Sequence, residues 1–365
     1  MALSRGFWSG KKVLITGHTG FKGAWLSLLL ERLEAKIYGY SLAEPVSTPN
    51  LYAAARVGES VESTSGDVRD LESLARAVAG AKPDVVFHMA AQPLVRRSYQ
   101  YPAETYATNV TGTVNLLEAV RRAGGIKAVV AVTSDKCYEQ REGVRSFRES
   151  DPLGGHDPYS SSKACAELVA AAYRSSFFSG AGAAAVATAR AGNVIGGGDW
   201  AEDRLLPDLV RAISGKTPVS IRKPESVRPW QHVLDPLSGY LTLARRLVED
   251  GPNFAEGWNF GPREGDARSV KWVAEGFLRH WPQAPRIELA AGAQPHEAAY
   301  LRLDCSKAAS RLAWTPRWDL EAALERTALW YQAFLAGKDM RAFTKTQIEE
   351  HLSRARGEGG LAAKS

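Results

Sequence analysis

The sequence predicts an α/β protein with a Rossmann-type, doubly wound parallel sheet and a smaller C-terminal α+β lobe. Apolar runs alternate with stretches of helical periodicity over about the first 190 residues, as in parallel strands joined by helices. A glycine-rich turn directly follows the first run, and glycine, proline and tryptophan become frequent after about residue 190. We expect a first domain over 1–190, to which later segments can return, a second over 191–345 and a flexible tail over 346–365.

The predicted elements of the first domain follow one another in regular order. Apolar runs predict strands at 12–16, 37–41, 84–88, 128–133 and 184–189, and a further strand is expected just before Asp67. Helical periodicity predicts helices at about 21–33, 103–123 and 159–178. This order is typical of a parallel sheet covered on both faces.

The composition is that of an ordinary soluble globular protein. Hydrophobic residues make up 45% of the 365 residues and charged residues 24%. Cys137, Cys165 and Cys305 have neither metal-ligand nor disulfide spacing, which favours a reducing compartment. The start of the chain has no pattern of a signal peptide, and no apolar run has membrane-spanning length. We therefore expect a cytoplasmic protein that does not contact membranes.

The net charge of +6 is spread along the whole chain. Because no dense basic block is present, nucleic-acid binding is not expected. A basic cleft that binds a diphosphate accounts for the same excess of positive charge.

Three glycines form the first functional motif. Gly17, Gly20 and Gly23 lie between the first strand and the first helix. Glycines at these positions allow a tight turn and a close approach of the backbone to a pyrophosphate, and the helix start offers free N–H groups. The motif indicates a dinucleotide site, although a purely structural turn has the same pattern.

The sequence leaves the type of dinucleotide open. NAD sites usually carry an acid at the end of the second strand, but residues 40–42 are Tyr-Ser-Leu. Glu44 is a possible substitute, whereas His18 and Lys22 near the phosphates also suit NADP. Asp67 is well placed to bind the adenine amine, or alternatively to cap the helix that begins near residue 70.

A tyrosine and a lysine define the predicted catalytic centre. Tyr159 and Lys163 are four residues apart near the start of a predicted helix, so their side chains share one helix face. A neighbouring ammonium lowers the pKa of a phenol and allows it to act as a base. Ser134 ends an upstream strand, where active-site residues of open sheets collect. Its presence argues against a chance occurrence of the Tyr159–Lys163 spacing.

These motifs resemble the extended short-chain dehydrogenase/reductase family from about residue 11 to about residue 331. The matching segments are GHTGFKG, GDVRD, FHMAAQP, TNVTGT, VTSDKCY and PYSSSKA. The resemblance implies that Ser134, Tyr159 and Lys163 form the catalytic set and that NAD is the cofactor. It also implies that the cofactor is lined by Gly17, His18, Gly20, Phe21, Lys22, Gly23, Asp67, Val68, Ala90, Ala91, Gln92, Asn109, Tyr159 and Lys163.

A second set of segments resembles the nucleotide-sugar 4,6-dehydratases that act on CDP-glucose. These segments are GHTGFKGAWLSL, SDKCY, AGNVIGGGDWAEDRLLPD, RKPESVRPWQHVLDPLSGY and WNFGP. Related enzymes that act on dTDP-glucose have Thr-Asp-Glu where this chain has Ser134-Asp135-Lys136. The lysine argues against dTDP-glucose, and it leaves the identity of the carbon-5 base open, because a lysine must be neutral to accept a proton.

The resemblance implies a reaction in which NAD is a recycled hydride carrier. We expect Tyr159 to take the 4-hydroxyl proton, Ser134 to bond the forming ketone and Lys163 to depress the pKa of Tyr159. Lys136 would then remove the carbon-5 proton, and a protonated Asp135 would donate to the leaving 6-hydroxyl. This scheme needs a lowered pKa for Lys136 and a raised one for Asp135, and an ion pair between them would oppose both shifts.

The C-terminal lobe is expected to bind the nucleotide diphosphate. By resemblance, Asn193, Arg204 and Arg228 are the substrate-binding candidates, with Arg190 a weaker one, because an arginine fork fits phosphate oxygens. The remaining aromatic and histidine residues are interpreted mainly as structural: Trp200, Trp230 and Trp258 as core, His88 and His156 as packing residues, and His232 as either structural or substrate-binding. No residue cluster suggests a metal.

Two other functions remain open at this point. A nucleotide-sugar epimerase or reductase would need Tyr159 and Lys163 but not Asp135 and Lys136. A non-catalytic NAD(P)-binding interaction protein predicts a broken Tyr-x-x-x-Lys set, whereas this one is intact. In similar proteins the helices at about 103–123 and 159–178 pair across a dimer interface, so a homodimer or a tetramer is expected.

Overall fold

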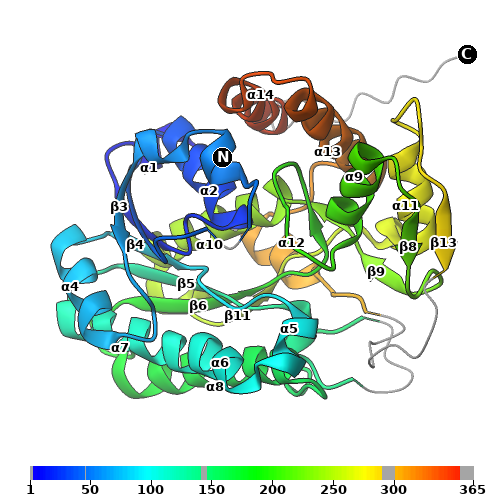
Figure 1. The fold of residues 1–365 in the computed structure, drawn as a ribbon. Helices are drawn as coiled ribbons and strands as arrows, with labels where there is room; N and C mark the ends of the chain where they lie inside the picture. Colours follow the sequence, from blue (N-terminus) through cyan, green and yellow to red (C-terminus); the bar gives the residue numbers. More distant parts are fainter. Residues whose placement is uncertain (1–2, 46, 141–145, 290–300, 354–365) are drawn as a thin grey trace, which may run out of the picture.

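The computed structural model describes residues 3–45, 47–140, 146–289 and 301–353. Figure 1 shows a central sheet with helices on both faces and, beside it, a smaller part built from the second half of the chain. No helix in these ranges is both long enough and apolar enough to cross a bilayer. The predicted α/β architecture is confirmed.

The sheet has seven parallel strands in the order β11-β6-β5-β4-β1-β2-β3. Their bounds are β1 Lys12–Thr16, β2 Lys36–Ser41, β3 Val61–Ser65, β4 Val85–His88, β5 Ala128–Val132, β6 Ala185–Arg190 and β11 Gly257–Asn259. The central strands are apolar because helices cover both of their faces, and all six residues of β6 are buried. The chain reverses direction along the sheet between β3 and β4, so β1 and β4 flank the point where such sheets bind ligands.

Helices cover the two faces of the sheet (Figure 1). One face carries α4 (Leu71–Ala81), α6 (Pro102–Tyr106), α7 (Gly112–Ala123) and α8 (Pro158–Phe177), and the other carries α2 (Phe21–Arg32) and α10 (Leu234–Asp250). The short helices are α1 (Arg5–Trp8), α3 (Leu51–Ala54) and α5 (Val95–Gln100). The start of α8 is fixed by Pro158 and by the Asp157 side chain, which accepts a hydrogen bond from the Ser160 amide.

The single helix expected over 103–123 is divided in the structure. A π-helical turn, η2 (Ala107–Thr111), separates α6 from α7. Within this turn Asn109 accepts a hydrogen bond from the Gln92 amide at 2.8 Å and donates to the Gln92 carbonyl at 3.1 Å. The wider turn thus brings Asn109 to the loop after β4, and π-helical turns are frequent at functional sites.

The smaller part contains short strands and five helices. Its bounds are β7 Val194–Ile195, α9 Leu205–Gly215, β8 Val219–Ile221, β9 Val227–Pro229, β10 Gln231–His232, β12 Ala267–Ser269, α11 Val270–Leu278, β13 Ile287–Leu289, α12 Ser306–Leu312, α13 Leu320–Leu335 and α14 Met340–Ser353. Two segments after residue 190 return to the sheet. The strand β11 pairs with β6, and α10 packs against β5 and β6.

Part of the predicted flexible tail is an ordered helix. Residues 346–353 belong to α14, and its Arg341 and Lys345 form ion pairs with Glu31 on α2. His351 is fully buried, with its Nε2 atom 2.9 Å from a carboxylate oxygen of Asp235. The expectation of a tail from residue 346 is therefore wrong for these eight positions, because tertiary contacts stabilise the helix. The rest of that tail, 354–365, lies outside the described residues.

The core interpretation of the tryptophans is confirmed. Trp200, Trp230 and Trp258 are at most 9% exposed and belong to the main hydrophobic core. The indole nitrogens of Trp230 and Trp258 donate to backbone carbonyls, which is how buried indoles are usually satisfied.

Candidate active site

The glycine loop forms a tight turn between β1 and α2. Gly17 has a φ of +77°, and a Cβ atom at this position would lie 2.7 Å from the Ala90 nitrogen. A Cβ at Gly23 would lie 2.2 Å from the Gly17 carbonyl oxygen. Since both contacts are with backbone, only glycine fits at these two positions, and the loop lies against the start of the helix.

This loop fits the pyrophosphate of a dinucleotide. Gly20 is the N-cap of α2 and provides no side chain that would occupy the helix start. The first-turn N–H groups and the positive end of the helix dipole are therefore directed toward the loop, which is the environment that binds phosphates.

His18 does not act as a cation at this loop. Its side chain is fully buried, its Nε2 atom lies 2.8 Å from the Ser63 hydroxyl, and burial lowers the pKa of its ring to about 4. The ring covers Gly39, where a Cβ would approach it to 2.5 Å. His18 is thus neutral near pH 7 and fills the space above β2 and β3.

The other cofactor candidates line the same edge of the sheet. Asp67 accepts hydrogen bonds from the backbone and side chain of Arg69, which lower the pKa of its carboxyl, while Asp70 caps α4. The alternative role of Asp67 as a helix cap is therefore wrong. The Ala90 amide lies 3.3 Å from Thr16 Oγ1, and Glu44 is exposed in the loop after β2.

The structure brings Ser134, Tyr159 and Lys163 together. Ser134 follows β5 and is the N-cap of the turn η3 (Asp135–Cys137), and the other two lie on α8. A hydrogen bond with Ser134 lowers the pKa of Tyr159, but burial outweighs it and raises that pKa to about 12. Lys163 donates to the Val132 carbonyl at 3.3 Å, and burial lowers the pKa of its ammonium to about 8.

Additional positive charge surrounds this trio. Lys22 on α2 interacts electrostatically with Lys163 and Arg204, and burial is the main cause that lowers its pKa to about 7. Arg204 also acts on Tyr159 and lowers the pKa of the phenol. Lys22 therefore faces the catalytic side chains as well as the glycine loop.

Asp135 is a buried acid beside Ser134. It is 1% exposed, and its Oδ1 atom accepts a hydrogen bond from Ser134 at 3.0 Å. Its Oδ2 atom has no hydrogen-bonding partner among the described residues. Burial raises the pKa of this carboxyl, although the charge of Lys136 opposes the shift, so the direction is the one that a proton donor requires.

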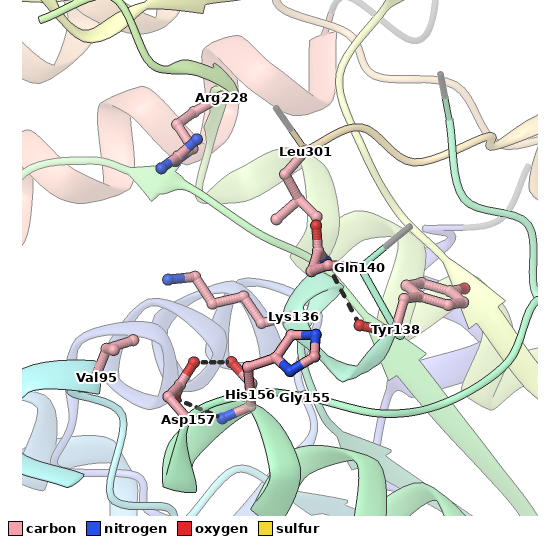
Figure 2. A pocket seen from close by; sticks show the side chains of 10 residues that line it. Val95, Lys136, Tyr138, Gln140, Gly155, His156, Asp157, Arg228 and Leu301 are labelled. Carbon is pink, nitrogen blue, oxygen red and sulfur yellow. Dashed lines mark hydrogen bonds between the residues drawn. The ribbon is translucent and has the colours of Figure 1, made fainter. Parts of the chain in front are cut away.

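Lys136 extends into a cavity on the other side of η3. Figure 2 shows its amine pointing into the space between Val95 and Arg228, with the ring of His156 below it. Arg228 is 6% exposed, and it acts electrostatically on Asp135. One turn thus carries a buried acid and a lysine that faces the cavity.

The substrate-lobe candidates do not all lie at this cavity. Arg228 lines it, Arg204 is held by Asp199 at 3.0 Å within reach of Tyr159, and Asn193 has a φ of +45° in the loop between β6 and β7. Arg190 is directed elsewhere: it is buried and paired with Glu167 at 2.7 Å. The interpretation of Arg190 as a diphosphate ligand is wrong, because its guanidinium is already bonded inside the protein.

Two histidines are structural, as expected for His88. His88 is 3% exposed, and its ring nitrogens lie 2.7 Å from Thr16 Oγ1 and 3.3 Å from Thr113 Oγ1. His232 is fully buried, and its ring packs against Trp25 and Trp318. Of the two readings left open for His232, the structural one is supported.

Sequence reasoning missed much of the cavity wall. The additional lining residues are Val95, Tyr138, Gln140, Gly155, His156, Asp157, Ser160 and Leu301. Of these only Asp157 carried a sequence signal, since an acid followed by proline marks the helix start next to Tyr159. His156 was expected to pack, but it lines the cavity beside Lys136.

A second, larger cavity lies between α5, α9 and β8. It has a volume of about 490 Å³ and is lined by Arg96, Asp203, Asp208, Arg211, Ala212, Thr217, Pro218, Val219, Ser220 and Arg222. Asp203 bridges Arg96 and Arg222 at 3.0 and 2.7 Å. Val95 and Arg96, consecutive residues of α5, line one cavity each.

Potential metal ligands do not cluster in the described part of the chain. Over the described ranges, no group of three or more His, Cys, Asp or Glu side chains is placed to hold a metal ion. The chemistry available here is acid–base chemistry by the tyrosine, the acid and the lysines.

Comparison with known proteins identifies close relatives. Residues 14–327 match the family model described as GDP-mannose 4,6 dehydratase. The chain is 52% identical over 355 residues to the CDP-glucose 4,6-dehydratase of Salmonella typhimurium strain LT2, covering 96% of this chain and 99% of the relative.

Solved structures with a similar fold contain bound NAD. A double mutant of the dTDP-glucose 4,6-dehydratase from Streptomyces venezuelae, crystallised with NAD, has a TM-score of 0.77 at 25% identity, covering 90% of this chain and 98% of that one. MoeE5 in complex with UDP-glucuronic acid and NAD has a TM-score of 0.74 at 27% identity, covering 88% and 99%. Sequence and structure comparisons thus lead to the same group of proteins.

Proposed function

The chain belongs to the GDP-mannose 4,6 dehydratase family, and from this premise we propose that it converts CDP-glucose to CDP-4-keto-6-deoxyglucose with loss of water. The observation that carries the proposal is the juxtaposition of Ser134, Tyr159 and Lys163 with the buried acid Asp135 and with Lys136. An epimerase needs the first three residues only. The extensive identity to a CDP-glucose 4,6-dehydratase supports the same function.

The cofactor of this reaction is NAD, as in the neighbouring dehydratase structures. When bound, NAD accepts the hydrogen of carbon 4 together with its electron pair and gives it back at carbon 6. The glycine loop and the start of α2 would hold its pyrophosphate, and the segment around Ala90 and Asn109 would complete its site. The buried, neutral His18 adds no charge to this site.

Tyr159 is the base for the 4-hydroxyl group. Its phenol bonds to Ser134, so a sugar oxygen near Ser134 also lies near the phenol. Arg204 supplies positive charge that lowers the pKa of the phenol, and we expect the Lys163 ammonium, one helical turn from Tyr159, to act in the same direction. The proton of the 4-hydroxyl therefore goes to the Tyr159 oxygen, and Ser134 donates to the ketone oxygen that forms.

Asp135 and Lys136 carry out the elimination. The carbon-4 ketone makes the carbon-5 proton acidic, and the Lys136 amine is positioned in the cavity to accept it and to return a proton to carbon 5 when hydride reaches carbon 6. Asp135, whose pKa is raised by burial, holds the proton that the leaving 6-hydroxyl needs. These two side chains distinguish dehydration from simple redox exchange at carbon 4.

The nucleotide half of the substrate would occupy the second cavity. Arg228 lines the first cavity and Arg204 acts on Tyr159, and both side chains suit a diphosphate. Its aspartates can accept hydrogen bonds from the exocyclic amine of cytosine, and its arginines can donate to the carbonyl oxygen at carbon 2. Thymine and uracil lack this amine, so the lining favours a cytidine nucleotide.

A panel of nucleotide sugars tests the proposed function. Wild-type protein with NAD should convert CDP-glucose to a 4-keto-6-deoxy product, identified by mass and NMR. Its kcat/KM should exceed that for dTDP-, UDP- and GDP-hexoses by at least about ten-fold, since one well-made base contact contributes about 1–3 kcal/mol. A stereoisomer of CDP-glucose as the only product would instead identify an epimerase.

We also propose that the protein is a cytoplasmic homodimer or tetramer. Large apolar side chains are exposed on the adjacent helices α5, α6 and α8 and on the residue between α5 and α6: Tyr99, Tyr101, Tyr106, Leu168 and Phe177. Exposed apolar side chains on adjacent helices favour association through them. Sedimentation velocity should return at least the mass of a dimer, and a monomer at micromolar concentration would contradict this proposal.

A further inference from the structure

Glu167 lies behind the catalytic residues, inside a buried polar network. Its side chain is 3% exposed, and its carboxylate accepts hydrogen bonds from Arg190 at 2.7 Å, from the Thr188 hydroxyl at 2.6 Å and from the Thr133 hydroxyl. Thr133 directly precedes Ser134, and Glu167 follows Lys163 by one helical turn. A single carboxylate therefore joins α8 to the end of β5 and to β6.

Arg190 extends this network to the other end of the catalytic turn. Its Nη1 atom donates to the Tyr138 hydroxyl at 2.7 Å, and the Tyr138 hydroxyl donates to Asn259 Oδ1 at 2.7 Å. Tyr138 directly follows η3, which carries Asp135 and Lys136. The Glu167–Arg190 pair is thus connected to both ends of this turn and to the helix that bears Tyr159.

We propose that Glu167 is a positioning residue for the dehydration: it aligns α8 with the turn η3 and places a negative charge one helical turn from the Lys163 ammonium. It does not touch the substrate, because it is buried and bonded by three donors. The inference rests on the proposed function for its consequence in catalysis. The contacts of Glu167 and its effect on the charge of Lys163 do not depend on that function.

The negative charge of Glu167 affects the pKa of Lys163, and the other groups around Lys163 show why. The titratable groups that face or influence it are Tyr159 and Glu167 on α8, Cys137 on η3, His88 at the end of β4 and Lys22 on α2. Burial keeps the Cys137 thiol and the His88 ring neutral, because it raises the pKa of the former and lowers that of the latter to about 3. Glu167 supplies the negative charge that raises the pKa of Lys163 against the effect of burial.

A purely structural role predicts a different outcome. Removing one partner of a buried ion pair leaves an uncompensated charge and is destabilising, so a purely structural role of Glu167 would lower the melting temperature alone. A positioning role also affects the protonation of Lys163. The reaction needs Lys163 as a cation, so activity should fall as the pH rises through the pKa of Lys163, which is about 8.

The experiment compares Glu167→Gln with Glu167→Asp in the full-length protein. With Gln, the alkaline limb of the kcat profile should move to lower pH by about one unit, since a nearby opposite charge shifts a pKa by about 1–3 units. With Asp, which keeps the charge, the limb should stay at the wild-type pH. The matched control is Glu31→Gln on α2, which loses the ion pairs with Arg341 and Lys345, is not part of this network and should leave the limb unchanged.

A second readout separates this inference from the proposed function. The pH dependence of Lys163 acetylation, followed by mass spectrometry of the modified peptide, reports its protonation whether or not CDP-glucose is turned over. The labelling midpoint should fall in Glu167→Gln by the same amount as the kinetic limb. If Glu167→Gln does not fold, the double variant Glu167→Gln, Arg190→Gln leaves neither charge unpaired. It should show a smaller shift in the same direction, because loss of the Arg190 charge partly offsets loss of the Glu167 charge at Lys163. A wild-type limb and labelling midpoint, with only the melting temperature reduced, would overturn the inference.

Discussion

Replacing Tyr159 by phenylalanine should lower kcat for CDP-glucose by about 10²- to 10⁴-fold, which is the usual contribution of a general base. The change removes one oxygen atom, the one that bonds to Ser134 and accepts the 4-hydroxyl proton. Burial raises the pKa of this phenol to about 12, while Ser134 and Arg204 act to lower it. The phenolate thus depends on the positive charge around it, and phenylalanine cannot replace it.

The fold should tolerate this substitution. Tyr159 is 8% exposed on α8, and phenylalanine keeps its apolar contacts. Tyr173→Phe, on the same helix and outside the site, is the matched control and should retain wild-type kcat. Steady-state kinetics with circular dichroism separates loss of chemistry from loss of structure, and a Tyr159→Phe variant with a kcat within a few-fold of wild type would remove Tyr159 from the mechanism.

Asp135→Asn and Lys136→Met should stall the reaction at two different points. In deuterated water, Lys136→Met should lose exchange of the carbon-5 hydrogen with solvent, because the amine that accepts this proton is gone. Asp135→Asn should retain this exchange but release water at least about 10²-fold more slowly, because the amide has no acidic proton to donate. NMR of the recovered sugar measures both processes in one sample.

The pH dependence of water loss tests whether Asp135 acts as the proton donor. Burial raises the pKa of this carboxyl, and the acid is active only while protonated, so water loss in the wild type should slow as the pH rises through that pKa. Lys36→Met, at an exposed position at the start of β2, is the control for loss of a lysine. Wild-type turnover in either Asp135→Asn or Lys136→Met would show that the assigned role is wrong.

Local sequence patterns were sufficient to predict most of the sheet, whereas the catalytic set of Ser134, Tyr159 and Lys163 rested on the family resemblance. The strand over 12–16 has the predicted bounds, because a short apolar run between a turn and a glycine motif is compatible with few secondary structures other than a buried strand. The meeting of Ser134 with Tyr159 also follows from topology, since residues at the carboxyl ends of parallel strands collect at one edge.

Other features depend on contacts that no local pattern reveals. The π-turn at Asn109 exists because this side chain bonds to the Gln92 backbone, 17 residues earlier. The strand β11 has only three residues and is defined by its pairing with β6. The first cavity combines Val95, His156 and Leu301 from distant parts of the chain, so its wall could not be predicted.

Arg190 shows why the face of a buried strand is hard to predict. Residues two apart on a strand point to the same side, and in β6 both Thr188 and Arg190 face Glu167 on α8. Because both faces of a buried parallel strand are apolar, periodicity does not indicate which side carries the polar residues. The arginine was therefore assigned to the substrate, whereas it belongs to the network behind the site.

The central claim is that one site moves a hydrogen within the sugar while water leaves from carbons 5 and 6. Its most direct test is a single incubation of the wild-type protein, with NAD, and CDP-glucose carrying deuterium at carbon 4, followed by NMR of the product. We predict a 4-keto-6-deoxy sugar with the deuterium at carbon 6. Deuterium that remains at carbon 4, or that appears in the solvent, would contradict the account.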